Sequence, residues 1–148
     1  MPTSPIVQLL LLFGVAGVAF AAWKGGRAER IAAAVVAGNL VIGLLIQVFT
    51  PSLQGTFRFA NDGLAALILL GVTVRYGAAW MGGIMLFYAA QFSLHSFYIV
   101  TGRSNREYLH ALINNINFAS IILCLVIGTA VAWRRRALAT KATPRAAT

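Results

Sequence analysis

Acidic residues and cysteine are scarce in this sequence. Its 148 residues include 3 Asp and Glu against 12 Lys and Arg, and one cysteine, Cys124. A single cysteine excludes an intrachain disulfide, and there is no CxxC motif of the kind that binds metal or carries out thiol chemistry. GxSxG, HExxH and P-loop motifs are also absent, and no acid stands near either histidine in a triad pattern. We therefore expect no conventional catalytic function.

The sequence is rich in long apolar runs. Apolar residues make up 59% of the chain and charged residues 10%, whereas an average soluble domain has about 45–50% and about 25%. The net charge of +9 is concentrated at the ends of the apolar runs, which is typical of residues that flank membrane spans. The sequence predicts an all-α integral membrane protein in contact with the bilayer, and the charge pattern argues against nucleic-acid binding.

Five apolar runs can be read as spans, given that a spanning helix needs about 20 mostly apolar residues. The third run is short, because residues 52–62 read as a loop and Asn61-Asp62 as the N-cap of a helix. We expect a five-helix transmembrane bundle, with four spans and a short re-entrant or tilted helix as the alternative. The single transmembrane domain covers residues 1–136, with spans at about 6–23, 31–50, 59–74, 78–100 and 109–133.

Basic residues predict the orientation of the chain. With five spans and the C-terminus in the cytoplasm, nine of the 12 Lys and Arg residues lie inside, as the positive-inside rule requires. With four spans, the basic turn around Lys24 would move outside, against that rule. We expect the N-terminus outside, the C-terminus inside, and a disordered basic cytoplasmic tail over residues 137–148.

Polar side chains gather on one face of each of the last two predicted spans. Residues three and four apart share a helix face, and the helical period places each group within an arc of about 60–80°. Because the two helices are consecutive, antiparallel and joined by a short loop, these faces can meet. The groups are Tyr88, Gln91, His95 and Tyr98 in the fourth span and His110, Asn114 and Asn117 in the fifth, with Asn115 pointing the other way.

The two histidines are expected at one level, within roughly 5–8 Å of the outer end of their helices. They could ligate haem b between the helices, or bind a quinone headgroup together with Asn and Tyr. A metal ion is disfavoured, because Glu107 is the one nearby carboxylate. The simpler interpretation is that these groups join helices by hydrogen bonds. The candidate cofactor-binding residues are His95, His110, Gln91, Tyr88, Asn114 and Asn117.

Charged residues are not expected at the centre of any span. Asp62, Arg75 and Glu107 all fit at span boundaries, which argues against a proton-coupled transporter or pump, since such proteins carry intramembrane charges. In the second span Asn39 and Gln47 are expected to form interhelical hydrogen bonds.

These features favour a non-catalytic function. We expect an accessory or assembly subunit of a larger complex in a bacterial inner membrane, in contact with other integral membrane proteins or a second copy of itself. One alternative is a haem- or quinone-binding redox protein that uses His95 and His110. Another is a small transporter or channel with a path along Asn39, Gln47, Gln91 and Asn114.

Overall fold

Five α-helices make up the structure, a computed structural model that describes residues 4–49, 53–103 and 108–142. The prediction of an all-α bundle is confirmed. Each helix is long and apolar enough to cross a membrane, by length and composition, as expected of a multi-pass membrane protein. The helices are α1 (Pro5–Lys24), α2 (Arg27–Phe49), α3 (Gln54–Tyr76), α4 (Ala79–Thr101) and α5 (Tyr108–Ala142).

The third helix differs most from its prediction. α3 has 23 residues, as many as α2 and α4, so it is not a short re-entrant segment. The predicted loop over residues 52–62 is wrong from Gln54 onwards, and residue 52 lies outside the described residues. Asn61 and Asp62 are therefore inside the helix and do not cap it. α3 ends at Tyr76 and is capped by Gly77, whose φ of 61° is the left-handed conformation that glycine adopts at helix ends.

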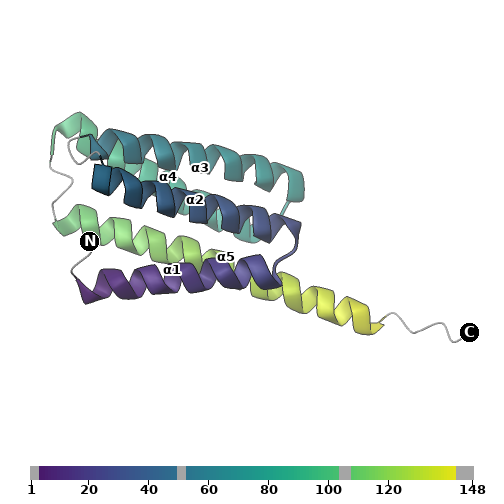
Figure 1. Cartoon of the computed structure of the whole chain (residues 1–148). Coiled ribbons are helices and arrows are strands. Elements are labelled where there is room, and N and C mark those ends of the chain that lie inside the picture. Colours follow the sequence, from purple (N-terminus) through teal and green to yellow (C-terminus); the bar gives the residue numbers. More distant parts are fainter. Residues whose placement is uncertain (1–3, 50–52, 104–107, 143–148) are drawn as a thin grey trace, which may run out of the picture.

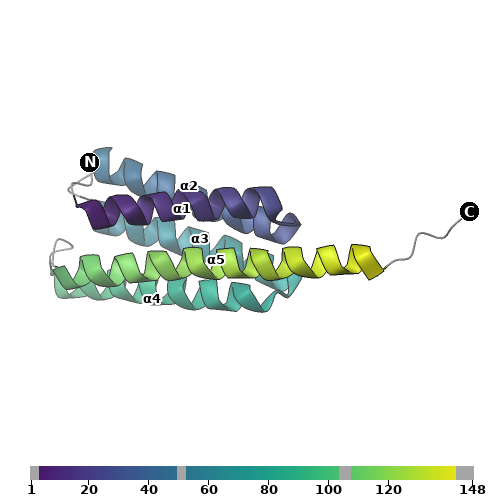
Figure 2. The ribbon, with the colours of Figure 1, turned by 90° about the horizontal axis from the view of Figure 1, so that it is seen from below.

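The fifth helix is longer than predicted. α5 continues through residues 137–142, so the prediction of disorder is wrong for them, and residues 143–148 lie outside the described part of the chain. Its C-terminal part extends past the ends of the other helices (Figures 1 and 2). Residues 133–141 are exposed along this extension.

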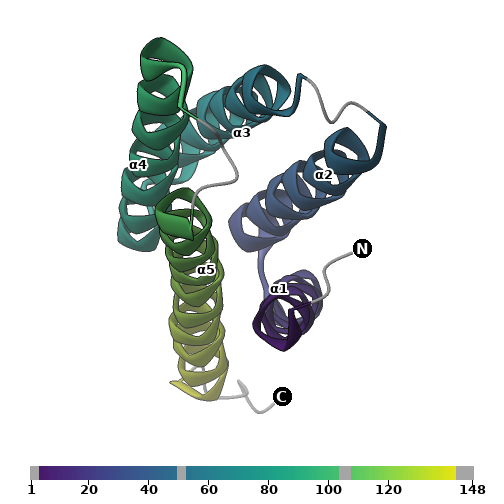
Figure 3. The same ribbon diagram turned by 90° about the vertical axis from the view of Figure 1, so that its left-hand side faces the viewer.

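The helices form a ring in which each packs against its neighbours in sequence, and α5 returns to pack against α1. Figure 3 shows this arrangement from the end where α1 begins. At that end α1 and α2 lie well apart, whereas at the other end a two-residue turn joins them (Figures 1 and 3). The bundle is therefore tied together at one end and splayed at the other, and we call these the tied end and the splayed end.

Small residues allow the close packing between α1 and α5. Gly14 and Gly17 are buried, and a Cβ at Gly17 would lie 2.6 Å from Ile122. A Cβ at Gly14 would meet the ring of Phe118 at the same distance. Glycine at both positions lets the side chains of α5 rest on the backbone of α1.

The tied end is fixed by polar contacts around the α1–α2 turn. The Gly26 backbone N–H donates to Glu29 Oε2 at 2.7 Å, as when a glutamate in the first turn caps its own helix. Arg136 of α5 lies 3.6 Å from the same carboxylate oxygen and donates to the Lys24 carbonyl at 2.8 Å. These contacts join three helices where the chain turns.

Candidate functional site

The interior of the bundle is divided into an apolar half and a polar half. Toward the tied end it is filled by apolar side chains from all five helices, including Ala21, Val36, Leu69, Ile84 and Leu125. Toward the splayed end α3, α4 and α5 carry the buried polar side chains Asp62, Gln91, His95, His110 and Asn117. These five side chains lie together in one half of the molecule, whereas the buried side chains of Glu29 and Thr129 lie toward the tied end.

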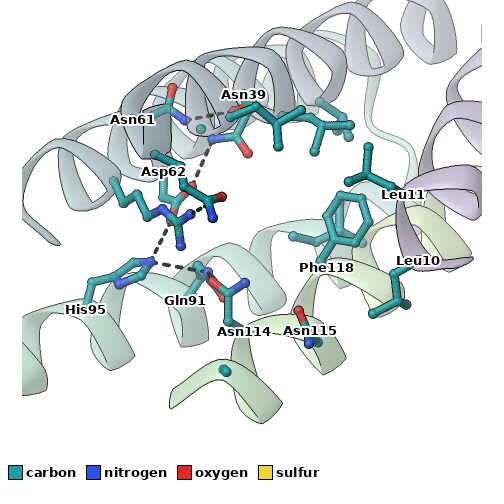
Figure 4. Close-up of a pocket in the computed structure, with 18 of the residues that line it drawn as sticks. Leu10, Leu11, Asn39, Asn61, Asp62, Gln91, His95, Asn114, Asn115 and Phe118 are labelled. Carbon is teal, nitrogen blue, oxygen red and sulfur yellow. Dashed lines mark hydrogen bonds and ion pairs between the residues drawn. The ribbon is translucent and has the colours of Figure 1, made fainter. Parts of the chain in front are cut away.

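A cavity of about 290 Å³ occupies the polar half. Asn, Gln, His, Asp and Arg side chains of α2 to α5 form one part of its wall, and aliphatic side chains of α1 and α2 form another. Figure 4 shows this separation, with Asp62, His95 and Gln91 at one side and Leu10, Leu11 and Phe118 at the other. The polar lining residues are Asn39, Gln47, Arg58, Asn61, Asp62, Tyr88, Gln91, His95, His110, Asn114 and Asn115.

Asp62 is a buried acid inside a spanning helix, with 8% of its surface exposed. It is the ninth residue of α3, about 12 Å along the helix axis from the first. Asn39 Nδ2 of α2 donates to its Oδ1 at 2.9 Å, and His95 Nε2 of α4 lies 3.1 Å from its Oδ2. The expectation that Asp62 fits at a span boundary is wrong, and so is the argument against intramembrane charge that rested on it.

His95 is at the centre of the polar half, and 1% of its surface is exposed. Its Nδ1 lies 3.3 Å from Nε2 of His110, so the two histidines occupy one level, as the sequence predicts. Its Nε2 faces Asp62 Oδ2 and, at 3.3 Å, the amide nitrogen of Gln91. Both ring nitrogens of His95 therefore have polar partners.

Gln91 joins α4 to α5 through both ends of its carboxamide. Its Nε2 donates to Asn114 Oδ1, and its Oε1 accepts from Asn117 Nδ2 at 3.0 Å. These bonds confirm that the polar faces of the last two helices meet.

Two tyrosines flank this network. Tyr88 is buried and lines the cavity on the side of the apolar half. Tyr98 is also buried, and its ring packs edge-on against His110, with centroids 4.7 Å apart. All six predicted candidate residues thus lie around one cavity or against the residues that line it.

The predicted interhelical hydrogen bonds of α2 are confirmed. Asn39 donates to Asp62, and its backbone carbonyl accepts from Asn61 Nδ2 at 3.0 Å. Gln47 Oε1 accepts from Arg58 at 3.4 Å. Together these bonds tie the C-terminal half of α2 to the N-terminal half of α3 along the cavity wall.

Sequence reasoning missed several residues of the site. Asp62, Asn61 and Arg58 were assigned to a loop or a helix N-cap, although their spacing of three and four residues could have indicated one polar helix face. Asn115 was expected to point away, but it lines the cavity beside Asn114. Because α5 packs against both α4 and α1, the arc of α5 that faces the interior is wide enough to include both asparagines.

A haem between the two histidines does not fit this geometry. His95 Nδ1 and His110 Nε2 are in direct contact, with ring centroids 5.2 Å apart, so a macrocycle would have to force the rings apart. The second ring nitrogen of His95 faces Asp62. Among the described residues, which exclude Glu107, no three His, Cys, Asp or Glu are grouped so as to hold a metal ion.

The four residues predicted to line a transport path, Asn39, Gln47, Gln91 and Asn114, all line the cavity. Beyond Tyr88 the interior is filled by the apolar cluster of Leu69, Ile84 and Leu125. The cavity is therefore a pocket at the splayed end.

In comparisons with known proteins, no family model, no curated protein and no solved structure matches the chain.

Proposed function

We propose that this protein binds a membrane-soluble amphiphile of the quinone class in the cavity at its splayed end. The observation that carries the proposal is the division of the cavity wall. One part is aliphatic, with Val7, Leu10 and Leu44, and the other presents hydrogen-bonding groups of α2 to α5. Ligand pockets commonly combine an apolar lining with a few converging polar groups. A ligand with a polar ring and an apolar chain matches both parts.

The arrangement of the helices supports entry from the bilayer. The aliphatic wall is built by α1 and α2, the pair that lies apart at the splayed end (Figure 3). An apolar chain can leave the cavity between these two helices and remain in lipid while the headgroup is held inside. A polar solute from water would gain nothing from an aliphatic wall.

The polar side chains favour a headgroup that both accepts and donates hydrogen bonds. Amide N–H groups and imidazoles can donate to a carbonyl oxygen, and Asp62 and the carboxamide oxygens can accept from a hydroxyl. A quinone presents carbonyls and a quinol presents hydroxyls, so this lining can pair with both forms. The proposal keeps the quinone from the predicted haem- or quinone-binding alternative. In it His95 and His110 form hydrogen bonds and do not ligate haem.

The test is to fill the cavity without disturbing the helices. Gly43 lines the cavity, and a Cβ there would meet no atom within 4 Å. We expect Gly43→Leu to weaken binding of a short-chain ubiquinone analogue by at least about tenfold, because its side chain occupies the headgroup volume. Gly71→Leu is the matched control, since Gly71 is exposed on α3 and equally uncrowded. Equal affinities in both variants, or no binding to the wild type, would contradict the proposal.

The role of accessory subunit stays a second proposal, and the extension of α5 favours it. Residues 133–141 are exposed and include the basic residues Arg134, Arg135 and Lys141, and the helix extends past the bundle beyond the contacts of Arg136. A helix that projects beyond the bundle presents a surface to a partner. Native mass spectrometry of the protein extracted in mild detergent would show added polypeptide mass if the proposal holds. A lone chain that carries only a small adduct would favour the ligand-binding function instead.

For location, we propose a bacterial inner membrane with the N-terminus outside. The basic residues near the tied end support this orientation through the positive-inside rule. In a Cys124→Ala background, Thr140→Cys should then be shielded in intact cells from a membrane-impermeant maleimide, and Leu53→Cys should react. The reverse labelling pattern would invert the proposed orientation.

A further inference from the structure

Asp62 differs from the other polar side chains that line the cavity, because an ionised carboxylate accepts hydrogen bonds and donates none. Within the described part of the chain it is the single carboxylate of the lining. Carboxamides, neutral imidazoles and the tyrosine hydroxyl each carry both a donor and an acceptor, and the guanidinium of Arg58 carries donors alone. At Asp62, therefore, a ligand must itself donate the hydrogen bond.

The donors of the cavity do not distinguish a quinone from its quinol. The oxygen of a quinone carbonyl and the oxygen of a quinol hydroxyl both accept hydrogen bonds, so Arg58 and the amide nitrogens can pair with either form. A carboxylate does distinguish them, because a hydroxyl donates to it, whereas a carbonyl can only turn a lone pair toward it. Discrimination between the two forms therefore falls to Asp62.

The Asp62 carboxylate has acceptor capacity left for a ligand. Its Oδ1 accepts from Asn39 Nδ2 at 2.9 Å, and its Oδ2 lies 3.1 Å from His95 Nε2 (Figure 4). A carboxylate has about four lone-pair sites, so these two contacts do not saturate it. The Asp62 side chain lines the cavity with 11% of its surface exposed, against 1% for His95. A ligand in the cavity can therefore reach the carboxylate.

The neighbours of Asp62 are the partners that a carboxylate needs. His95 Nε2 lies closer to it, at 3.1 Å, than to the Gln91 amide nitrogen, at 3.3 Å, and that amide donates to Asn114. A ring proton on His95 Nε2 is therefore donated to the carboxylate. Arg58, about 6 Å nearer the splayed end along α3, interacts electrostatically with Asp62. Together these contacts fix an acceptor in the cavity wall.

We propose that Asp62 makes the cavity selective for the reduced form of its ligand, the quinol, over the quinone. One hydroxyl of the quinol donates to the Asp62 carboxylate, and a hydrogen bond to an ionised acceptor is roughly twice as strong as a neutral one. A quinone in the same position would place a carbonyl lone pair against the carboxylate. Sites that bond a hydroxyl discriminate strongly against an analogue that lacks it. This inference rests on the proposed function and adds to it which redox form is held.

The ratio of two affinities tests the selectivity. The full chain in nanodiscs is titrated in the absence of oxygen with a short-chain ubiquinol analogue and, separately, with the corresponding quinone. We expect the quinol to bind at least about tenfold more tightly. Equal affinities, or tighter binding of the quinone, would overturn the selectivity and leave the proposed function standing. If neither form binds, the proposed function fails and the selectivity fails with it.

A matched pair of variants tests whether Asp62 is the cause. Asp62→Asn keeps the size of the side chain and replaces one acceptor oxygen with a donor, so the preference for the quinol should fall by at least about tenfold. Glu29→Gln is the control, because Glu29 is also a buried carboxylate but contacts Gly26 and Arg136 at the tied end. A wild-type ratio in Asp62→Asn, or an equal loss in Glu29→Gln, would reject Asp62 as the discriminating residue.

A third measurement needs no variant. Asp62 is the only aspartate in the sequence, so a ¹³C-aspartate label reports one carboxyl group. We expect the quinol to shift the carboxylate infrared band of Asp62 and the quinone to leave it near its ligand-free position. A shift of the same size with both forms, or no shift with the quinol bound, would contradict the contact. This result stands even if Asp62→Asn fails to fold.

Discussion

At the scale of single residues, Gln91 carries the contact between the polar faces of α4 and α5. It bonds two asparagines of α5 and faces His95 on its own helix. Replacing it with leucine leaves the partly buried amide group of Asn114 and the buried amide group of Asn117 without their partner. An unsatisfied buried polar group costs about 1–3 kcal/mol.

We therefore expect Gln91→Leu to lower the free energy of unfolding by about 1–3 kcal/mol. The measurement is reversible denaturation in detergent micelles. Ser93→Leu is the control, because Ser93 is exposed on the same helix and should change stability little. Equal effects in the two variants would mean that the network adds nothing to stability.

The contrast between Gln91 and Asp62 shows what a sequence reveals about such a site. Gln91, His95 and His110 interrupt strongly apolar runs, so their periodicity was visible and their meeting could be predicted. Asp62 follows Arg58 and Asn61, and together they lower the apolar character of their segment enough to resemble a loop. Their helix is stabilised by partners on α2 and α4. Because these partners are distant in sequence, the local spacing could indicate a polar helix face but not what that face would contact.

At the scale of elements, glycine positions separate tight helix contacts from open ones. A Cβ at Gly128 of α5 would lie 2.3 Å from the ring of Trp80 on α4, whereas a Cβ at Gly71 of α3 would meet nothing within 4 Å. The first glycine permits close packing, and the second costs the helix conformational entropy with no packing in return.

The same glycine-to-alanine substitution should have opposite effects on stability at these two positions. Gly128→Ala should destabilise the protein by about 1–3 kcal/mol, because the rigid indole must shift to make room. Gly71→Ala should stabilise it by up to about 1 kcal/mol through helix propensity. Thermal unfolding of both variants in one detergent gives the comparison. Stabilisation by both would show that α4 and α5 are not packed as described.

Element boundaries were predicted less well than element number. The five apolar runs gave the five helices, because a bilayer demands about 20 apolar residues for each crossing. The start of α3 and the end of α5 were missed, since helices extend beyond the apolar run where polar side chains find partners. Arg136 is one example, as it bonds the α1–α2 turn.

At the scale of the whole molecule, the division of the interior predicts a gradient of protection. Gln91 and His95 of α4 line the cavity, whereas Met81 and Ile84 of the same helix are buried away from it. Local opening has a lower free energy where packing is sparse. Backbone amides over 91–101 should therefore exchange with deuterium faster than those over 81–88, as measured by mass spectrometry in nanodiscs. Uniform protection along α4 would contradict a hydrated cavity.

The pairing of Asp62 on α3 with His95 on α4 also bears on how the chain enters a bilayer. These two helices are the least apolar of the five, and each carries one member of the pair. A lone α3 would bring an uncompensated acid into hydrocarbon, at a cost of about 2.5–3.5 kcal/mol on insertion scales. We expect the translocon to retain α3 until α4 emerges and to release the two as a hairpin. In a microsomal insertion assay, a segment with α3 alone should integrate poorly and one with both helices efficiently.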